Sequence, residues 1–170
     1  METRLHRQAN TWRMGGQWAC IMPDMPDTEP SATPVSVDPN RLKLTNDAAP
    51  DGPLAGTLIG FRCNECETTV FGPAIFCQQC TSTDLEAVEL GTKGILFSYT
   101  IVRIPPAGWP GDVPYVLGQV ELPQGPQVLA EVIDCEHDDL KIGMAVEMTL
   151  QAVPAENGGP DKAVYKWRPA

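Results

Sequence analysis

The chain contains Cys63-Asn64-Glu65-Cys66 and, after ten intervening residues, Cys77-Gln78-Gln79-Cys80. Each Cys-x-x-Cys pair can place two thiolates on one tight turn, and a short hairpin between the pairs can bring the two turns together. Four sulfurs arranged in this way suit a tetrahedral ion such as zinc, which has no redox chemistry and is satisfied by four soft ligands. The spacing therefore predicts a structural zinc site with Cys63, Cys66, Cys77 and Cys80 as ligands.

Other uses of the four cysteines have less support. Two disulfides would suit an exported protein, but no apolar run follows the basic residues at the N-terminus, and cytosolic thiols stay reduced. A redox pair of the thioredoxin type needs one Cys-x-x-Cys in a strand–helix–strand setting that the sequence does not offer. An iron centre with four sulfur ligands would use the same residues, so iron stays open as an alternative. Because four protein ligands leave no open position, we expect the ion to hold the fold and to do no chemistry.

Composition and charge favour a turn-rich protein that binds neither nucleic acid nor membrane. The 170 residues include 17 Pro and 15 Gly, which favour loops and short strands over long helices. No run of 18 apolar residues is present, so we expect no transmembrane helix and a cytoplasmic protein. Residues 57–170 hold seven Lys or Arg against fifteen Asp or Glu, a net charge of −8. Binding along a nucleic acid needs clustered positive charge, which this part of the chain lacks.

The sequence divides into three segments. Residues 1–56 include a proline-rich stretch and predict an extended or disordered arm, with a short helical turn expected at Arg41–Leu44. Residues 57–90 predict a zinc ribbon, in which the alternation of apolar and acidic residues along Leu85–Leu90 indicates a strand with one face in water. Residues 91–170 predict an all-β barrel.

The barrel segment predicts five short strands. In the first strand, Ile95, Phe97, Tyr99 and Ile101 are expected to share one face, because side chains alternate along a strand. Gly118 in the second strand suggests a bend or a bulge. A single helical turn is expected between the third and fourth strands. This order suits a five-stranded Greek-key barrel of the OB type. The strands are expected near residues 95–102, 115–122, 127–133, 144–150 and 163–167.

Several motifs between Arg62 and Pro169 occur together in one order. With these motifs the chain resembles the zinc-ribbon OB-fold family of acyl-CoA-associated proteins, known as domain of unknown function 35. The match covers about two-thirds of the chain and is far more specific for the fold than for a reaction. The motifs are Arg62-Cys63-x-x-Cys66, Phe71-Gly72-Pro73, Cys77-x-x-Cys80, Ser98–Val102, Pro114–Gly118 and Asp138–Glu147.

The resemblance implies an auxiliary subunit in a hetero-oligomer. Proteins of this family bind thiolases, or hydratases of the hot-dog type, and the partner supplies the reacting side chains. It therefore implies a thiolase or acyltransferase complex with acyl-CoA at a shared site, and a hot-dog enoyl-CoA hydratase complex as the alternative. A β-oxidation thiolase, a benzoylsuccinyl-CoA thiolase and a hydroxymethylglutaryl-CoA-forming assembly all fit. A single-stranded nucleic-acid-binding OB module is a third hypothesis, which the acidic balance disfavours.

The residues outside the four-cysteine motif offer no catalytic set of their own. The other cysteines are Cys20 and Cys135, and the histidines are His6 and His137. A thiolase needs a nucleophilic cysteine with histidine bases beside it. Cys135 and His137 could pair, but catalytic groups normally converge from distant segments into a pocket. We expect a half-buried thiol and a solvated imidazole instead.

Three residues are candidates for contact with the partner or with acyl-CoA. Trp109 lies in the Pro/Gly-rich loop between the first two barrel strands, a loop that commonly lines the ligand face of OB-folds. It could be an interface anchor, or it could fold back over the barrel mouth. Arg62 and Arg103 could bind CoA phosphates, because charge-assisted bonds to phosphate favour Arg, or they could be ordinary surface arginines.

Overall fold

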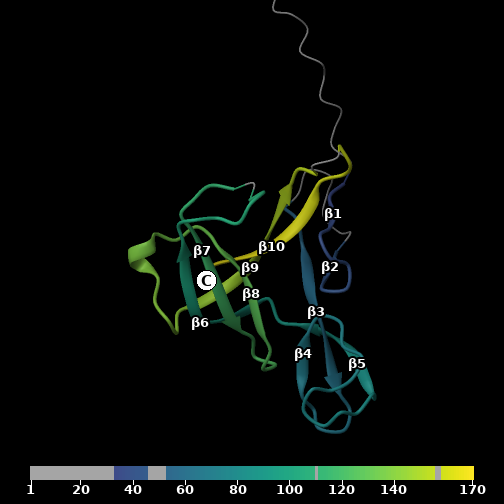
Figure 1. Cartoon of the computed structure of the whole chain (residues 1–170). Helices are drawn as coiled ribbons and strands as arrows, with labels where there is room; N and C mark the ends of the chain where they lie inside the picture. The colour runs from purple at the N-terminus through teal and green to yellow at the C-terminus, as the bar shows by residue number, and fades with distance from the viewer. Residues whose placement is uncertain (1–32, 46–52, 110, 156–157) are drawn as a thin grey trace, which may run out of the picture. The chain divides into compact units, whose positions relative to one another are not determined.

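A computed structural model describes residues 33–45, 53–109, 111–155 and 158–170 of the chain. Within these ranges the chain forms ten strands and one 3₁₀ turn, and the strands make two β-sheets (Figure 1). No helix in this described part is long and apolar enough to cross a membrane. The fold is mainly β, as the sequence predicts.

Five strands close a barrel: β6 (Lys93–Val102), β7 (Tyr115–Glu121), β8 (Gln127–Val132), β9 (Ala145–Val153) and β10 (Lys162–Pro169). β6, β7 and β8 pair antiparallel in succession, and β10 pairs parallel with β8 where Trp167 faces Val132. β9 pairs antiparallel with both β10 and β6, which closes the ring. The 3₁₀ turn η1 (His137–Asp139) lies between the third and fourth barrel strands. This is the five-stranded OB barrel that the sequence predicts.

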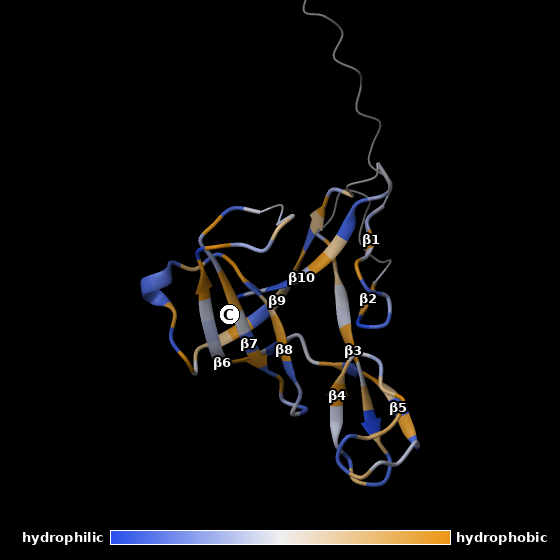
Figure 2. Ribbon diagram, viewed as in Figure 1, coloured by the Kyte–Doolittle hydropathy of each residue, from blue (hydrophilic) through white to orange (hydrophobic). Residues whose placement is uncertain are grey.

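The barrel interior is filled by alternate side chains of its strands. Hydrophobic and polar residues alternate along the barrel strands in Figure 2, as expected for sheets with one dry face. Val120, Val128 and Trp167 are fully buried. Burying an aliphatic side chain of this size stabilises a fold by roughly 1.5–3 kcal/mol relative to leaving it exposed. The barrel is thus held by an ordinary apolar core.

A β-bulge in β6 changes which residues face the core. The register with β7 shifts between Leu96 and Ser98, so that Phe97 has no partner across the ladder. Leu96 is fully buried before the bulge, whereas Tyr99 and Ile101 pack against the core after it. Phe97 stays exposed. The expectation that Phe97 shares a face with Tyr99 and Ile101 is therefore wrong, because one extra residue reverses the alternation.

Gly118 does not form the bulge that the sequence suggested at that position. A Cβ atom at Gly118 would lie 2.5 Å from Cγ2 of Val132 and 3.0 Å from Cδ1 of Leu96. The glycine is required because side chains from two neighbouring strands occupy the space that its own side chain would need.

A second sheet forms around the strand that carries the first cysteine. Its strands are β2 (Leu42–Leu44), β3 (Gly56–Cys63), β4 (Thr69–Phe71) and β5 (Leu85–Leu90). β3 pairs antiparallel with all three of the others. Leu58 of β3, Leu42 and Leu90 are buried in the same apolar cluster as the barrel core. The ring of Phe71 also meets the ring of Tyr165 edge to face, with centroids 5.9 Å apart. The base of the ribbon is therefore joined to the barrel by apolar contacts.

Residues 33–45 lie in the segment that the sequence assigns to the arm, and they add one strand to each sheet. β1 (Val35–Ser36) pairs parallel with β10, and β2 pairs with β3. The helical turn expected at Arg41–Leu44 is wrong. The N–H groups of Arg41 and Leu42 donate to the Asp38 carbonyl at 3.0 and 2.9 Å, and the chain then continues as a strand. Pairing with β3 satisfies the backbone of these residues in place of a helix.

The contacts of Gly118 predict that Gly118→Ala destabilises the barrel by about 1–3 kcal/mol, because the added methyl group overlaps Val132 and Leu96. Urea unfolding measures the change. Gly159→Ala is the matched control, since the nearest atom to a Cβ there is 4.0 Å away. Adding Val132→Ala to Gly118→Ala should cost less than the sum of the two changes. Equal stability of the Gly118 and Gly159 variants would contradict this account.

Candidate metal centre

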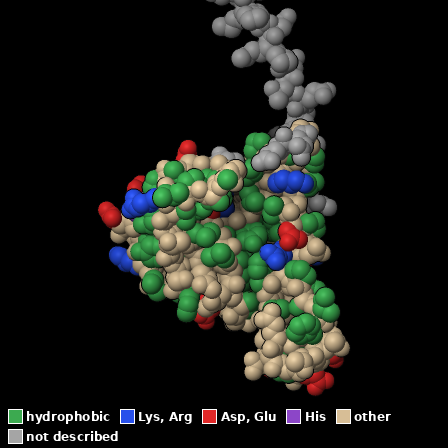
Figure 3. All heavy atoms as spheres, in the orientation of Figure 1, with side chains coloured by type: hydrophobic (Ala, Val, Ile, Leu, Met, Phe, Trp, Pro, Cys, Tyr) green, Lys and Arg blue, Asp and Glu red, His purple; other side chains and the backbone are tan. Residues whose placement is uncertain are grey.

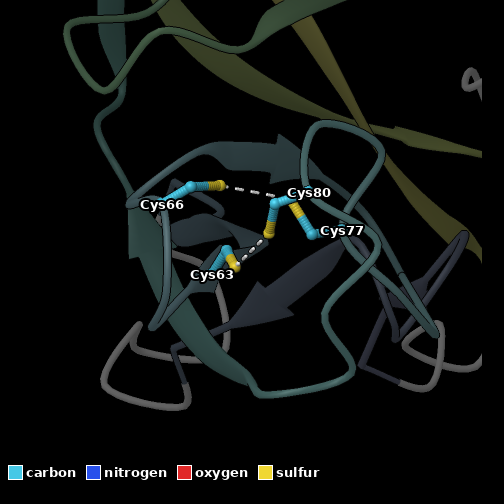
Figure 4. Close-up of side chains that lie close together, drawn as sticks. All are labelled: Cys63, Cys66, Cys77 and Cys80. Atoms are coloured by element: carbon cyan, nitrogen blue, oxygen red, sulfur yellow. Dashed lines mark hydrogen bonds between the residues drawn. The ribbon is translucent and has the colours of Figure 1, made fainter.

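The four cysteines lie on two tight turns, here called knuckles, at one end of the ribbon. The first knuckle is residues 63–68 and begins at the last residue of β3, and the second is residues 77–82. All four sulfurs lie within 4.8 Å of one another, and their side chains converge (Figure 4). Cys63 and Cys77 are buried, while Cys66 and Cys80 lie nearer the surface.

The two knuckles are built by equivalent hydrogen bonds. In the first, Glu67 N–H donates to the carbonyl of Cys63, and Cys63 N–H donates to the carbonyl of Thr68, both at 2.9 Å. In the second, Thr81 N–H donates to the carbonyl of Cys77 at 2.9 Å, and Cys77 N–H donates to the carbonyl of Ser82 at 2.7 Å. Each turn thus closes on its own first cysteine, which fixes the direction of both sulfurs.

A left-handed residue follows the second cysteine of each knuckle. Glu67 has φ 60° and Thr81 has φ 63°. This conformation is unfavourable for side chains other than Gly, Asn and Asp, and most unfavourable for a β-branched residue such as Thr. The knuckle hydrogen bonds hold both residues there. The same backbone conformation at the same position makes the two knuckles equivalent in geometry.

The sulfur positions fit a tetrahedral ion and exclude disulfides. Cys63 Sγ lies 3.5 Å from Cys80 Sγ, and Cys66 Sγ lies 3.4 Å from Cys77 Sγ. A disulfide would need a separation of about 2.05 Å. Four sulfurs at about 2.3 Å from one zinc ion would be about 3.8 Å apart. The cluster can therefore hold one metal ion, with each knuckle contributing two ligands.

Hydrogen bonds and neighbouring thiols shift the pKa values of Cys66 and Cys80 in opposite directions. The hydrogen bond to the Thr68 side chain, at 3.2 Å, is the largest influence on Cys66 and lowers its pKa to about 6. At Cys80, a backbone hydrogen bond from Ser82 lowers the pKa, but the neighbouring thiols and desolvation outweigh it and raise the pKa to about 12. A metal ion binds cysteines as thiolates, so metal binding at this cluster must release the thiol protons.

Sequence reasoning missed the residues that support the ligands. Thr68 and Ser82 both lie two residues after the second cysteine of their pair, and both carry a hydroxyl group. That equivalence is visible in the sequence and could have identified them. The side chain of Asn64 also donates to Asp84 Oδ1 at 2.9 Å, and its backbone N–H donates to the Asp84 carbonyl. This pair connects the first knuckle to the segment that leaves the second.

Among the described residues, Cys135 and His137 make no hydrogen bond with each other. The Cys135 thiol donates to the carbonyl of Glu136 at 3.5 Å. Burial, together with the charges of Asp139 and Glu136, raises the pKa of this thiol above its ordinary value. A raised pKa disfavours the thiolate that nucleophilic attack requires. Cys20 and His6 lie outside the described residues.

Trp109 stacks on Tyr115, with ring centroids 4.3 Å apart and an interplanar angle of 16°. The indole is half-buried and lines an open cavity of about 630 Å³ on the barrel together with Leu129, Val164 and Tyr165. A half-buried ion pair between Lys166 and Glu131, 2.7 Å long, also lines it. The stack holds the loop against β7 and keeps one face of the indole at the cavity.

The two arginines have different surroundings. Arg62 Nη2 lies 2.9 Å from Glu67 Oε1, so this arginine pairs with a residue of the first knuckle. Arg103 is exposed just after β6 and makes no ion pair with the described residues. Nothing in these contacts brings Arg62 and Arg103 to one binding site.

Comparison with known proteins matches this arrangement to a family. The family model described as "ChsH2, C-terminal OB-fold domain" matches residues 87–151. A "DUF35 domain-containing scaffold protein" of Methanocaldococcus jannaschii is 32% identical over 116 residues, which cover 66% of this chain and 81% of that protein. The chain belongs to the DUF35 family.

Other DUF35-related proteins carry more specific names. A benzoylsuccinyl-CoA thiolase subunit BbsA of Geobacter metallireducens is 29% identical and covers 65% of this chain and 73% of its own length. A probable enoyl-CoA hydratase alpha subunit of Thermomonospora curvata is 34% identical over 55% of this chain, but only 29% of that subunit is matched. The solved Ltp2–ChsH2(DUF35) aldolase matches with a TM-score of 0.54 and 29% identity, over 66% of this chain and 84% of its own.

The geometry of the cluster predicts that Cys63→Ser abolishes stoichiometric metal binding, because it removes one of four ligands and places a hydroxyl beside the ion. Elemental analysis for zinc and iron, together with the amide spectrum of the ribbon, measures the loss. Cys135→Ser is the matched control and should keep one ion per chain. Since metal binding contributes folding free energy, the outer half of the ribbon around the knuckles should unfold in the Cys63 variant, while the ribbon base and the barrel stay folded. Full metal content in Cys63→Ser would refute the assigned cluster.

Proposed function

We propose that this chain is the non-catalytic, zinc-binding subunit of an acyl-CoA thiolase or acyltransferase complex. In this role it stabilises the catalytic partner and shapes the entrance that acyl-CoA uses. Residues 57–90 act as the zinc ribbon and residues 91–170 as the barrel, with residues 1–56 as the preceding arm, from which β1 and β2 pair with the barrel and the ribbon. The observation that carries the proposal is the match, over about two-thirds of the chain, to a DUF35 scaffold protein and to a thiolase subunit.

The four-cysteine cluster supports a structural role for the metal. Zinc fits the donor set best, because four thiolates in tetrahedral arrangement saturate it and leave no position for water or substrate. Iron bound by the same four cysteines is the alternative, and elemental analysis distinguishes the two metals. Free thiols as ligands also suit a reducing compartment, which is consistent with a cytoplasmic protein.

The remaining chemistry of the chain supports a partner that does the catalysis. Burial and the charges of Asp139 and Glu136 raise the pKa of the Cys135 thiol. His137 lies in the short 3₁₀ turn after it. Thiolase chemistry requires an activated cysteine with a positioned histidine base, and the described residues outside the four-cysteine cluster offer no such pair. The chain therefore contributes binding surface rather than reacting groups.

An accessory role in an enoyl-CoA hydratase complex is the second candidate, favoured by the match to a hydratase subunit. That match covers less of both proteins than the thiolase-subunit match does. Both candidates require a catalytic partner and an acyl-CoA, and they differ in which enzyme co-purifies. Binding to single-stranded nucleic acid is disfavoured by the net charge of −8 over residues 57–170.

Isolation of the complex tests the proposal. The affinity-tagged full chain, purified from its native host, should bring down an enzyme of the thiolase family in fixed stoichiometry, identified by mass spectrometry. The chain alone should show no thiolysis or condensation of acyl-CoA, whereas the complex should. A hot-dog hydratase in place of the thiolase would select the second candidate. Turnover by the isolated chain that Cys135→Ala abolishes would reject the non-catalytic role.

The position of Trp109 predicts an effect on the complex. Trp109→Ala should weaken assembly by about 2 kcal/mol or raise the KM for acyl-CoA, because it removes a large aromatic side chain from the mouth of the barrel cavity. Trp109→Phe is the control, since a phenyl ring can keep the stack on Tyr115. Zinc content should stay the same in both variants. If Trp109→Ala assembles as the parent does and has the same KM for acyl-CoA, then Trp109 only covers the barrel and the prediction is wrong.

A further inference from the structure

Two large apolar side chains project from the loop between the knuckles. Ile75 is 87% exposed and Phe76 is 55% exposed, and Phe76 directly precedes the ligand Cys77. Single exposed apolar residues are common on protein surfaces. Two adjacent ones of this size, on a short loop next to a metal centre, make a concentrated apolar tip. We call Ile75 and Phe76 the ribbon tip.

The loop that carries the ribbon tip is fixed at both ends. At its start, Gly72 N–H donates to the carbonyl of Ile59 at 3.0 Å, and a Cβ at Gly72 would lie 2.8 Å from Nε of Arg41. The guanidinium of Arg41 lies 5.7 Å from the centre of the Phe71 ring. At its end, Cys77 is held by the second knuckle. Only residues 73–76 lie between these fixed points, so the tip is pre-organised and loses little freedom on binding.

The ribbon that carries the ribbon tip is acidic. Residues 57–90 contain one basic side chain, Arg62, and five acidic ones, all exposed. Figure 3 shows acidic side chains beside hydrophobic ones at the free end of the ribbon. Two of the five form ion pairs, Glu67 with Arg62 and Glu89 with Lys43. The five acidic residues are Glu65, Glu67, Asp84, Glu86 and Glu89.

We propose that the ribbon tip docks into an apolar pocket of the catalytic subunit and that basic side chains of that subunit surround the pocket. This rests on the proposed function, and it adds the surface through which the complex forms. Interface hot spots are apolar or aromatic side chains that fill a desolvated pocket. Complementary charge around such a contact guides association and disfavours other partners. The metal contributes by fixing the loop, so that binding does not have to order it.

The test uses the full chain and the purified catalytic subunit that co-purifies with it. The double variant Ile75→Asp/Phe76→Asp should bind that subunit at least about 30-fold more weakly, because two charges replace the apolar contact. Its zinc content should equal that of the parent, since both side chains are exposed. The Kd is measured by titration calorimetry. Ile75→Val/Phe76→Leu should bind within about threefold of the parent, because it keeps the tip apolar.

Ile142→Asp is the matched control for the charge change. Ile142 is 69% exposed and lies in the turn before β9, away from the ribbon. This variant should bind the catalytic subunit as the parent does. Parent binding should also slow as NaCl is raised, since salt screens attraction between an acidic ribbon and a basic rim. Glu65→Gln/Glu86→Gln should lower the association rate and reduce this salt dependence.

The outcomes distinguish a failure of the proposed docking surface from a failure of the proposed function. If the parent binds an acyl-CoA enzyme and the double Asp variant binds equally well, the ribbon tip is not the docking surface, while the proposed function stands. If the double Asp variant and Ile142→Asp lose binding equally, the effect is one of charge in general and the inference fails. If the parent binds no acyl-CoA enzyme, the proposed function and this inference fail together.

Discussion

Convergence of four sulfurs on one point determines whether the outer half of the ribbon can fold. Within residues 57–90, the buried side chains near the knuckles are the ligands Cys63 and Cys77 themselves, whereas Leu58 and Leu90 are buried at the opposite end, in the core shared with the barrel. The base of the ribbon is therefore stabilised by the hydrophobic effect. Its outer half has almost no apolar core, so an ion bound by the four cysteines would supply the folding free energy there. The strained backbone at Glu67 and Thr81 adds a cost that such metal bonds would offset.

The same division separates the barrel from the ribbon by what stabilises each of them. The barrel needs no metal because alternating strands bury an apolar interior around Trp167. The ribbon places its four cysteines where an apolar core would lie, and it presents a short loop whose exposed side chains are not required for a core. The proposed docking surface therefore lies where the fold does not need the residues.

The sequence predicts the ligands and the barrel topology because both depend on local patterns. Cysteine spacing identifies the knuckles. Alternating side chains in short runs bounded by glycines and prolines identify the barrel strands. The bulge at Phe97 was not predictable, since Ile95, Phe97, Tyr99 and Ile101 alternate as an unbroken strand would. The packing at Gly118 depends on Val132, which approaches only when the sheet has formed. Strand β1 lies in a proline-rich stretch and owes its conformation to pairing with β10, a contact distant in sequence.

Strands β1 and β2 have a consequence for how the chain can be shortened. β9 pairs with one edge of β10, and the other edge of β10 is shared by β1 and β8. In the second sheet, β5 pairs with one edge of β3, and the other edge of β3 is shared by β2 and β4. One short segment thus covers an open edge of both sheets, and the hydroxyl of Ser36 bonds to the carbonyl of Leu42 across it. A version of the protein beginning at the ribbon would expose unpaired backbone on β3 and β10. Exposed edges of this kind template strand addition between molecules, so such a truncation would be prone to aggregate even with its metal bound.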